Sequence, residues 1–235
     1  MHTSFPRVLQ EEMLDGLPEN DPRAIRSRRD LQRINRIMGA AGIISEALKR
    51  SQRIPKRIVE LGAGDGSLML ALAKRFAAAW PGVQVTLLDR LNLVSSATVE
   101  EFNCLGWTVD ILQADVLEWA ESPMIRQWDI GLANLFIHHF DSMQIQSLFA
   151  ALGKRIDLFV ACEPRRSRLP LFASKLVGLI GANAVTRKDA VLSVQAGFYG
   201  QELSTLWPSD ISEWSLEEGA ARLFSHRFIA RREAG

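Results

Sequence analysis

The sequence has 235 residues, of which 47% are hydrophobic and 23% are charged. This length and this balance are typical of a globular protein with one large α/β domain, and they exclude a disordered or fibrous chain. The 28 Lys and Arg residues nearly cancel the 27 Asp and Glu residues, which leaves a net charge of +1. Proteins that bind long nucleic acids usually carry a clear cationic excess, so we expect no obligate nucleic-acid partner.

Three features of the sequence predict a cytoplasmic location. The first 16 residues contain acidic side chains where an export signal needs an apolar core. The longest apolar stretch, residues 169–185, is interrupted by Lys175 and two glycines, so we expect no membrane span. Cys104 and Cys162 lie alone in apolar surroundings, which indicates buried thiols in a reducing compartment rather than a disulfide or zinc site.

The first part of the chain, residues 1–53, is predicted to form a helical cap. Asp21 followed by Pro22 is a good helix start, and the apolar spacing predicts a helix over residues 24–38. Two glycines weaken this pattern before a second predicted helix over residues 43–49.

The segment from residue 21 to residue 57 is strongly basic. It contains eleven Lys and Arg residues against three Asp and Glu residues, a local excess of +8. Two interpretations stay open: the basic side chains form a solvated helix face, or they meet an anionic group of a substrate or cofactor.

From residue 57 to residue 162, predicted strands alternate with predicted helices. The strands are expected at residues 57–61, 83–89, 107–113, 128–134 and 155–162. The helices between them are expected at residues 67–79, 95–105 and 141–152, the last beginning with a capping box of Asp141 and Gln144. This alternation predicts a parallel sheet that is buried on both faces.

The C-terminal third shows a looser pattern. Helices are expected over residues 169–180 and 189–196. The chain then predicts a β-hairpin of residues 213–218 and 222–231, with the turn at Gly219 and Ala220.

A glycine-rich turn follows the first predicted strand and opens a predicted helix. It reads Glu60-Leu61-Gly62-Ala63-Gly64-Asp65-Gly66. Open parallel sheets bind their ligands beyond the carboxyl ends of the strands, where this turn is expected to lie. Glycine suits the position because a Cβ would block both the tight turn and the approach of a ligand.

Other nucleotide-binding patterns do not match this turn. A dinucleotide-binding turn needs a third glycine at position 67, which is Ser67, and the G-K-[S/T] sequence of a P-loop does not occur in the chain. A short-chain dehydrogenase needs a tyrosine and a lysine four residues apart, but the only tyrosine, Tyr199, precedes Leu203 at that spacing. These departures disfavour a nucleotide-dependent oxidoreductase.

The pattern E-x-G-x-G-x-G resembles the first motif of the class I S-adenosylmethionine-dependent methyltransferases, and the resemblance extends over residues 57–163. In that family, an acid after the second strand holds the ribose hydroxyls, and a residue after the third strand receives the adenine amino group. Asp89 and Asp115 occupy these positions here. Asn134 and Leu135 close the fourth predicted strand, where the family contacts the methionine part of its cofactor.

The resemblance implies S-adenosyl-L-methionine as the cofactor. The residues that it assigns to the cofactor site lie in the glycine turn and after three strands: Glu60, Gly62, Ala63, Gly64, Gly66, Asp89, Arg90, Asp115, Val116, Asn134 and Leu135. Val116 is expected to pack on the adenine ring. The implied fold is a Rossmann-like domain over residues 54–235, with a doubly wound, seven-stranded, mostly parallel sheet and an antiparallel C-terminal hairpin.

His138 and His139 follow the fourth predicted strand, beside the position of the sulfonium in this family. Methyl transfer needs a base only when the acceptor starts protonated, and imidazole has a suitable pKa for that role. Either histidine is a candidate catalytic base or polar contact to the substrate, and the sequence does not distinguish them. We expect no metal site from this pair, because adjacent residues seldom point at one ion.

Missing motifs narrow the class of acceptor. Methyltransferases that act on DNA or on amide nitrogen carry two prolines after the residue that closes the fourth strand. Here Asn134 is followed by Leu135 and Phe136, which disfavours those two classes of acceptor. Magnesium-dependent catechol-type enzymes place Asp at the fourth strand and Asp-Asn after the fifth, where this chain has Asn134 and Cys162-Glu163, so we expect no magnesium dependence. The apolar C-terminal third is interpreted either as ordinary packing or as the wall of a pocket for a hydrophobic acceptor.

The sequence therefore predicts methyl transfer to oxygen, or to an activated carbon, of a small hydrophobic or aromatic molecule. The overall pattern is similar to bacterial small-molecule methyltransferases of the quinone and secondary-metabolite type. Two alternatives stay open: an RNA methyltransferase that uses the basic segment 21–57, and a non-catalytic protein that binds the cofactor. Whether the chain forms a homodimer stays open as well.

Overall fold

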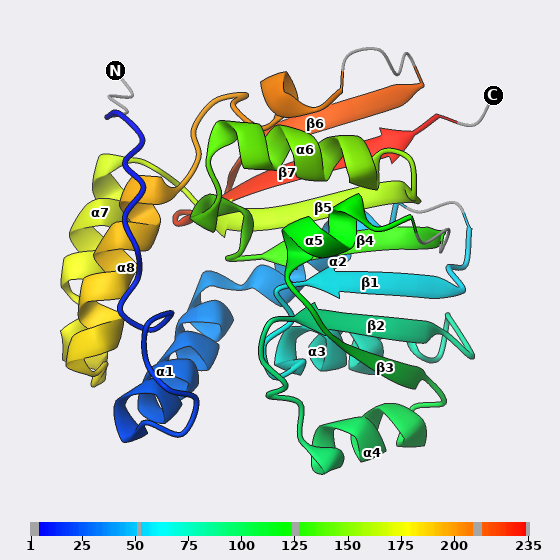
Figure 1. The fold of residues 1–235 in the computed structure, drawn as a ribbon, viewed down its shortest axis with the longest axis horizontal. Coiled ribbons are helices and arrows are strands. Elements are labelled where there is room, and N and C mark those ends of the chain that lie inside the picture. Colours follow the sequence, from blue (N-terminus) through cyan, green and yellow to red (C-terminus); the bar gives the residue numbers. More distant parts are fainter. Residues whose placement is uncertain (1–4, 51–52, 124–126, 209–212, 234–235) are drawn as a thin grey trace.

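The computed structural model describes residues 5–50, 53–123, 127–208 and 213–233, which form one twisted sheet with helices on both sides (Figure 1). The strands are β1 (Arg57–Leu61), β2 (Gln84–Asp89), β3 (Thr108–Gln113), β4 (Trp128–Asn134), β5 (Ile156–Pro164), β6 (Trp214–Ala221) and β7 (Ser225–Arg232). Their order across the sheet is β3-β2-β1-β4-β5-β7-β6, and only β7 and β6 pair antiparallel to their neighbours. The predicted seven-stranded, mostly parallel sheet with an antiparallel C-terminal hairpin is confirmed.

Some helices cover the two faces of the sheet, and others lie beyond the carboxyl ends of its parallel strands (Figure 1). The α-helices are α1 (Pro22–Met38), α2 (Ala40–Leu48), α3 (Ser67–Phe76), α4 (Ser96–Cys104), α5 (Val116–Glu121), α6 (Ser142–Leu152), α7 (Arg168–Lys175) and α8 (Ala184–Ala196). Short 3-10 helices form η1 (Ile137–His139), η2 (Val177–Ile180) and η3 (Ser204–Leu206). Among the described residues, no helix combines the length and the hydropathy that a membrane crossing requires.

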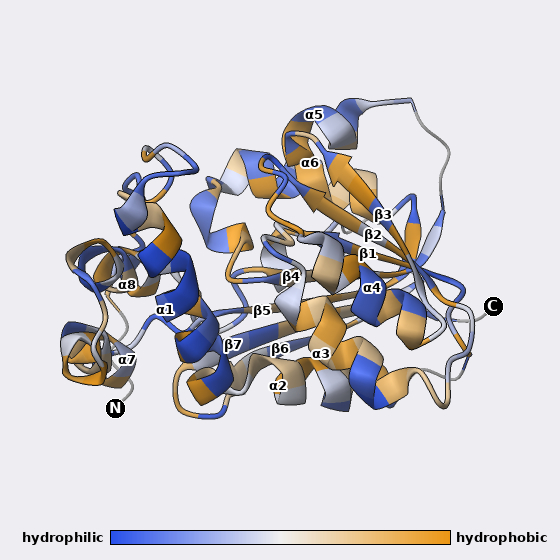
Figure 2. Cartoon of the chain, turned by 90° about the horizontal axis from the view of Figure 1, so that it is seen from below, coloured by the Kyte–Doolittle hydropathy of each residue, from blue (hydrophilic) through white to orange (hydrophobic). Residues whose placement is uncertain are grey.

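Alternate residues of the central strands point to opposite faces of the sheet, and each face has its own apolar cluster. Ile58 of β1 packs with side chains of α2, α3 and α4, whereas its neighbour Val59 packs with side chains of α5 and α6. The central strands are accordingly rich in hydrophobic residues (Figure 2). This burial on both faces is typical of a parallel sheet.

α1, α7 and α8 lie beyond the carboxyl ends of the parallel strands, where the arrowheads of β1 and β4 point (Figure 1). α2 behaves differently, because its Ile43, Ile44 and Leu48 are buried in the core under the sheet. The division of the chain into a cap over residues 1–53 and a domain over residues 54–235 stays a prediction.

Several predicted boundaries were wrong for local reasons. α8 begins before residue 189 because the Asn183 side chain accepts a hydrogen bond from the Thr186 N–H at 2.8 Å and caps the helix. The hairpin turn does not fall at Gly219, because β6 continues to Ala221 and the chain turns after it. α5, which Asp115 caps, was not predicted from the sequence.

Two further expectations need correction. The predicted helix over residues 169–180 is broken into α7 and η2. Cys104 is exposed at the end of α4, whereas Cys162 is buried as expected.

The burial of α2 predicts a large stability effect at Ile44, which is completely buried. Replacing Ile44 by Ala should lower the free energy of unfolding by about 2–5 kcal/mol, because it removes buried methyl groups and leaves a cavity. Urea unfolding followed by circular dichroism measures the change. Ile37→Ala is the matched control, because Ile37 of α1 is exposed, and its effect should stay within about 0.5 kcal/mol. Equal effects of the two variants would contradict the placement of α2 in the core.

Candidate active site

The glycine turn between β1 and α3 has a backbone that only glycine adopts without strain. Gly62, Gly64 and Gly66 have φ angles of +65°, +56° and +75°. A Cβ on Gly62 would overlap the ring of Phe136, whereas the space beside Gly64 holds no described atom within 4 Å. The turn therefore leaves room at Gly64 for a ligand to approach the backbone.

The acids after β2 and β3 are held by backbone N–H groups. Asp89 accepts hydrogen bonds from the Gly64 N–H at 2.8 Å and from the Leu91 N–H at 3.0 Å, one on each oxygen. Asp115 accepts one from the Leu117 N–H at 2.8 Å and caps α5. Because each carboxylate oxygen can accept two hydrogen bonds, both acids keep capacity for a ligand hydroxyl or amino group.

Glu60 is a buried acid with an unsatisfied oxygen. The residue is 2% exposed, and its Oε2 atom has no hydrogen-bond partner among the described residues. Burial, together with the nearby charges of Asp65 and Asp89, holds the pKa of Glu60 well above its usual range. A buried carboxyl group without a partner is costly, so this site is suited to a ligand that carries a positive charge or a donor.

Two adjoining cavities lie at this edge of the sheet. The inner cavity has a volume of about 200 Å³ and is bordered by the glycine turn, Glu60, Asn134 and both histidines. The outer cavity has a volume of about 630 Å³ and is bordered by Asp89, Arg90, Asp115 and Val116. Gly62, Leu135 and His139 border both of them.

Ten of the eleven residues assigned to the cofactor site thus border one cavity or the other. Gly66 is the exception. It starts α3, and a Cβ there would lie 2.9 Å from the Leu87 side chain, so the glycine allows the helix to pack close to β2.

The loop after β4 is organised by Glu163, which is completely buried at the end of β5. Its carboxylate accepts hydrogen bonds from the backbone N–H groups of Phe136 (3.1 Å), Ile137 (3.0 Å) and His138 (3.4 Å). It also pairs with Nδ1 of the His138 ring at 2.8 Å. One buried acid therefore fixes both the path of η1 and the orientation of an imidazole.

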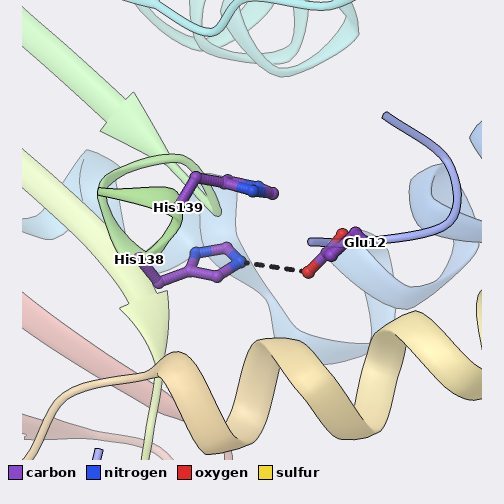
Figure 3. Close-up of side chains that lie close together, drawn as sticks. All are labelled: Glu12, His138 and His139. Carbon is purple, nitrogen blue, oxygen red and sulfur yellow. Dashed lines mark ion pairs between the residues drawn. The ribbon is translucent and has the colours of Figure 1, made fainter. Parts of the chain in front are cut away.

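His138 lies between two carboxylates, as Figure 3 shows for Glu12. Its Nε2 is 3.6 Å from Oε1 of Glu12 and has no hydrogen-bond partner among the described residues. Burial by itself lowers the pKa of His138, but the two acids, Glu12 and Glu163, outweigh burial and raise it from 6.5 to about 9. At neutral pH the ring is therefore mainly an imidazolium.

His139 has the opposite character. Its side chain is half-buried, and its Nδ1 lies 3.5 Å from Oδ2 of Asp15. Burial and the charge of the neighbouring His138 lower its pKa, so this ring is neutral at pH 7. The nitrogen and oxygen atoms of Glu12, His138 and His139 gather within 4.8 Å of one another, although the two histidines are adjacent in sequence.

The N-terminal segment from residue 5 to residue 15 contributes residues that the sequence analysis missed. Glu12 and Asp15 border the inner cavity, and the backbone N–H groups of Met13 and Leu14 bind Asp189 of α8 at 2.8 and 3.0 Å. Gln32 and Asn35 of α1 border the same cavity. No local pattern marks these residues, because their role depends on the way the segment and α1 fold back over the sheet.

A third cavity is almost entirely apolar. It has a volume of about 370 Å³ and lies between α1, η2 and α8, where Leu31, Ile34, Val177, Leu179 and Val194 border it. Leu31, Leu135 and Ser193 border both this apolar pocket and the inner cavity. The residues of the C-terminal third that border this pocket therefore lie beside the inner cavity, as the interpretation of that segment as a pocket wall requires.

Comparison with known proteins identifies the fold. Plantazolicin methyltransferase BpumL in complex with SAH resembles the structure with a TM-score of 0.65 and 13% sequence identity, over 91% of this chain and 92% of that chain. The chain has the same fold as this methyltransferase. An O-methyltransferase family protein from Burkholderia thailandensis gives a TM-score of 0.59 at 13% identity and covers 92% of this chain.

The pyocyanin biosynthetic protein PhzM shares this methyltransferase fold, with a TM-score of 0.58 and 19% identity over 94% of this chain. The chain spans about three fifths of the length of PhzM and of the Burkholderia protein (62% and 61%). No protein-family model and no curated protein sequence matches the chain.

The raised pKa of His138 predicts a pH-dependent contribution to stability. A group whose pKa is higher in the folded state stabilises the fold below its unfolded pKa, and this stabilisation is lost as the pH rises through the folded value. The stability advantage of the wild type over His138→Gln should therefore be full below pH 6.5 and decline toward pH 9. Urea unfolding at a series of pH values measures both proteins.

His139→Gln is the control for this experiment. Because the pKa of His139 is lowered, its charge change lies below pH 6.5. The difference between the wild type and this variant should stay constant between pH 6.5 and pH 9. A constant difference for His138→Gln over the same range would contradict the ion pairs of His138.

Proposed function

We propose that this protein transfers the methyl group of S-adenosyl-L-methionine to oxygen, or to an activated carbon, of a small hydrophobic or aromatic molecule. The observation that carries the proposal is the meeting of Glu60, Gly64, Asp89, Asp115 and Asn134 around two adjoining cavities at the carboxyl ends of the strands. BpumL, which has the same fold, is described in complex with SAH, the product that this cofactor leaves after methyl transfer.

The residues present fit this cofactor. Asp89 and Asp115 would hold the nucleoside in the outer cavity, where both keep unused acceptor capacity. Glu60 and Asn134 would hold the methionine part, because each has a buried oxygen without a partner among the described residues. When bound, the cofactor supplies an electrophilic methyl group on a positively charged sulfur.

The charges around the inner cavity support a cationic ligand there. Glu12 and Glu60 border it, and Glu163 lies just behind His138. The pKa of Glu12 is lowered, because its contacts with His138 and Ser193 outweigh its burial, so Glu12 is ionised at neutral pH. A cation in this cavity gains attraction from the charge of Glu12 in a site of low dielectric constant, and its arrival would favour the ionised form of Glu60, whose pKa is otherwise raised.

The apolar pocket between α1, η2 and α8 would hold the acceptor. Its lining is aliphatic, and it adjoins the inner cavity at Leu31, Leu135 and Ser193. An acceptor that places its hydrophobic part in this pocket would present its reactive group near His138. This arrangement supports a hydrophobic acceptor more directly than a nucleic acid.

His138 is the base in this proposal, and Glu163 is its positioning residue. The Nδ1–H group donates to Glu163, which leaves Nε2 directed toward the inner cavity and Glu12. A base oriented by a buried carboxylate is a recurring catalytic arrangement. In the neutral form, Nε2 would accept the proton of an acceptor hydroxyl, and the resulting imidazolium would be stabilised by Glu163 and Glu12.

The cofactor assignment predicts selective binding of S-adenosylhomocysteine. This compound should raise the melting temperature in a thermal-shift assay, whereas NAD(H) and NADP(H) should not, because only a ligand bound to the folded state stabilises it. Asp89→Ala should weaken binding by about 1–3 kcal/mol in calorimetry, the range for a lost hydrogen bond to a charged group.

Asp157→Ala is the matched control, because Asp157 is an exposed acid at the start of β5, at the opposite end of the sheet. Its affinity for S-adenosylhomocysteine should equal that of the wild type. Unchanged affinity in Asp89→Ala, or a melting shift with NAD(H) alone, would overturn the cofactor assignment.

The base assignment predicts which histidine controls turnover. With labelled S-adenosylmethionine and a panel of alkylphenols and naphthoquinols, His138→Gln should lower kcat by about 10²- to 10⁴-fold. His139→Gln should lower it by less than about tenfold, since the proton-accepting group remains. The wild-type kcat/KM for the cofactor should rise with pH toward about 9, because the pKa of His138 in the ligand-free protein lies there and only its neutral form accepts a proton.

A rate that rises with a midpoint below pH 6.5, and that is abolished in His139→Gln, would instead make His139 the base. Glu163→Gln tests the positioning role separately. It should shift the midpoint of the pH–rate profile to lower pH, because it removes one of the two acids that raise the pKa of His138.

A further inference from the structure

A row of large apolar side chains lies exposed along α7, η2 and the residue between them. Leu169, Phe172, Leu176, Leu179 and Ile180 form this row, which we call the apolar stripe. Phe172 is 62% exposed and Leu179 is 83% exposed. The first four residues recur at intervals of three and four, so those on α7 share one face of the helix, and that face points away from the core.

Basic residues are concentrated on the segments that carry and adjoin the apolar stripe. The chain from residue 165 to residue 188 contains no Asp or Glu and six Arg and Lys residues, of which Arg166 is buried and paired with Glu202. α1 contains six Arg residues and one Asp. α7 packs on α8, and α8 packs on α1. Figure 2 shows α7 at the edge of the molecule, with hydrophobic residues beside hydrophilic ones.

Three arginines converge on the tip of this surface, and we call them the basic rim. Arg26 and Arg33 of α1 donate to the carbonyl oxygens of Gly181 and Ile180, each at 3.5 Å. The side chain of Arg187 lies against Gly178. Arg33 also pairs with Asp30, which is buried beneath it. The residues on either side of the exposed Leu179 are thus in contact with three arginines, of which Arg33 is paired with an acid.

The apolar pocket lies behind the same surface. Leu176, Leu179 and Ile180 belong both to the stripe and to the lining of the pocket. The pocket in turn adjoins the inner cavity through Leu31 and Ser193. The stripe is thus continuous with the site already described.

We propose that the apolar stripe and the basic rim bind the surface of a membrane that contains anionic lipids. At the surface of such a membrane, apolar side chains are buried among the acyl chains, and basic side chains neutralise the anionic headgroups. A second copy of the chain would bring the two basic rims together, and charge repulsion opposes that contact. A nucleic acid would satisfy the arginines but would leave the stripe in water.

Binding in this orientation places the lining of the apolar pocket against the bilayer. A lipophilic molecule dissolved in the membrane then reaches the inner cavity without crossing water. The membrane proposal goes beyond the proposed reaction, because its test needs neither cofactor nor turnover.

Co-sedimentation with lipid vesicles tests the proposal on the full chain. The protein should bind vesicles of phosphatidylcholine mixed with phosphatidylglycerol, about tenfold or more tightly than vesicles of phosphatidylcholine alone, and added salt should weaken the binding. Phe172→Glu should weaken binding to the mixed vesicles by about tenfold or more, because it places a charge where an apolar side chain inserts. Leu179→Glu should act in the same direction.

Ile54→Glu is the matched control, because Ile54 is 60% exposed and precedes β1 at the opposite end of the sheet. It should bind the mixed vesicles as the wild type does. The circular dichroism spectrum and the rise in melting temperature with S-adenosylhomocysteine should be the same in all variants. These two controls distinguish a loss of membrane binding from a loss of folding or of cofactor binding.

Three results would overturn the proposal. The first is no binding of the wild type to the mixed vesicles. The second is equal binding of the mixed vesicles by Phe172→Glu, Leu179→Glu and the wild type. That result would mean that basic residues attract any anion, and an RNA oligonucleotide would then bind the protein in the same way. The third is a dimer in light scattering that Phe172→Glu converts to a monomer while vesicle binding is unchanged, which would assign the stripe to self-association.

Discussion

The shape of the candidate site depends on one buried carboxylate. Glu163 ends β5 inside the protein and binds the backbone N–H groups of three consecutive residues after β4, together with the ring of His138. A buried carboxylate without such partners would be strongly unfavourable, so the loop and the acid stabilise each other. The same contacts hold Phe136 beside the glycine turn, where it borders the outer cavity. The preceding residue, Leu135, borders both cavities. The fold and the chemistry of the site therefore meet at this residue.

The acids around the inner cavity outnumber the groups that satisfy them. Glu163 and Glu12 share the positive charge of His138. In the part of the chain that the structure describes, Glu60 contacts no positive charge and keeps an unsatisfied oxygen. Such a site binds a cation more readily than a neutral molecule, and a proton on His138 already occupies part of it. A cationic ligand in the inner cavity would compete with that proton and lower the pKa of the imidazole. In our proposal, cofactor binding and activation of the base are thus linked through charge.

The sequence predicted the parts of this protein that depend on local patterns. The central strands, the glycine turn and the acids after β2 and β3 were found because each has its own pattern of apolar, glycine or acidic residues. Glu12, Asp15 and Gln32 were missed, since only tertiary folding brings the N-terminal segment and α1 over the sheet. The extra strand residues after Gly219 were missed because β6 stays paired with β7 as far as Ala221, past the turn signal at Gly219 and Ala220. The break between α7 and η2 was missed as well. His138 and His139 were found as a pair, but only their surroundings distinguish them.

The most direct test of this account is a crystal structure of the protein with S-adenosylhomocysteine. We expect the nucleoside in the outer cavity between Asp89 and Asp115, and the amino-acid part in the inner cavity with a donor at the unsatisfied oxygen of Glu60. We also expect Glu163 to keep its contacts with the loop after β4. Density for the compound elsewhere, or Glu163 turned away from His138, would contradict the account.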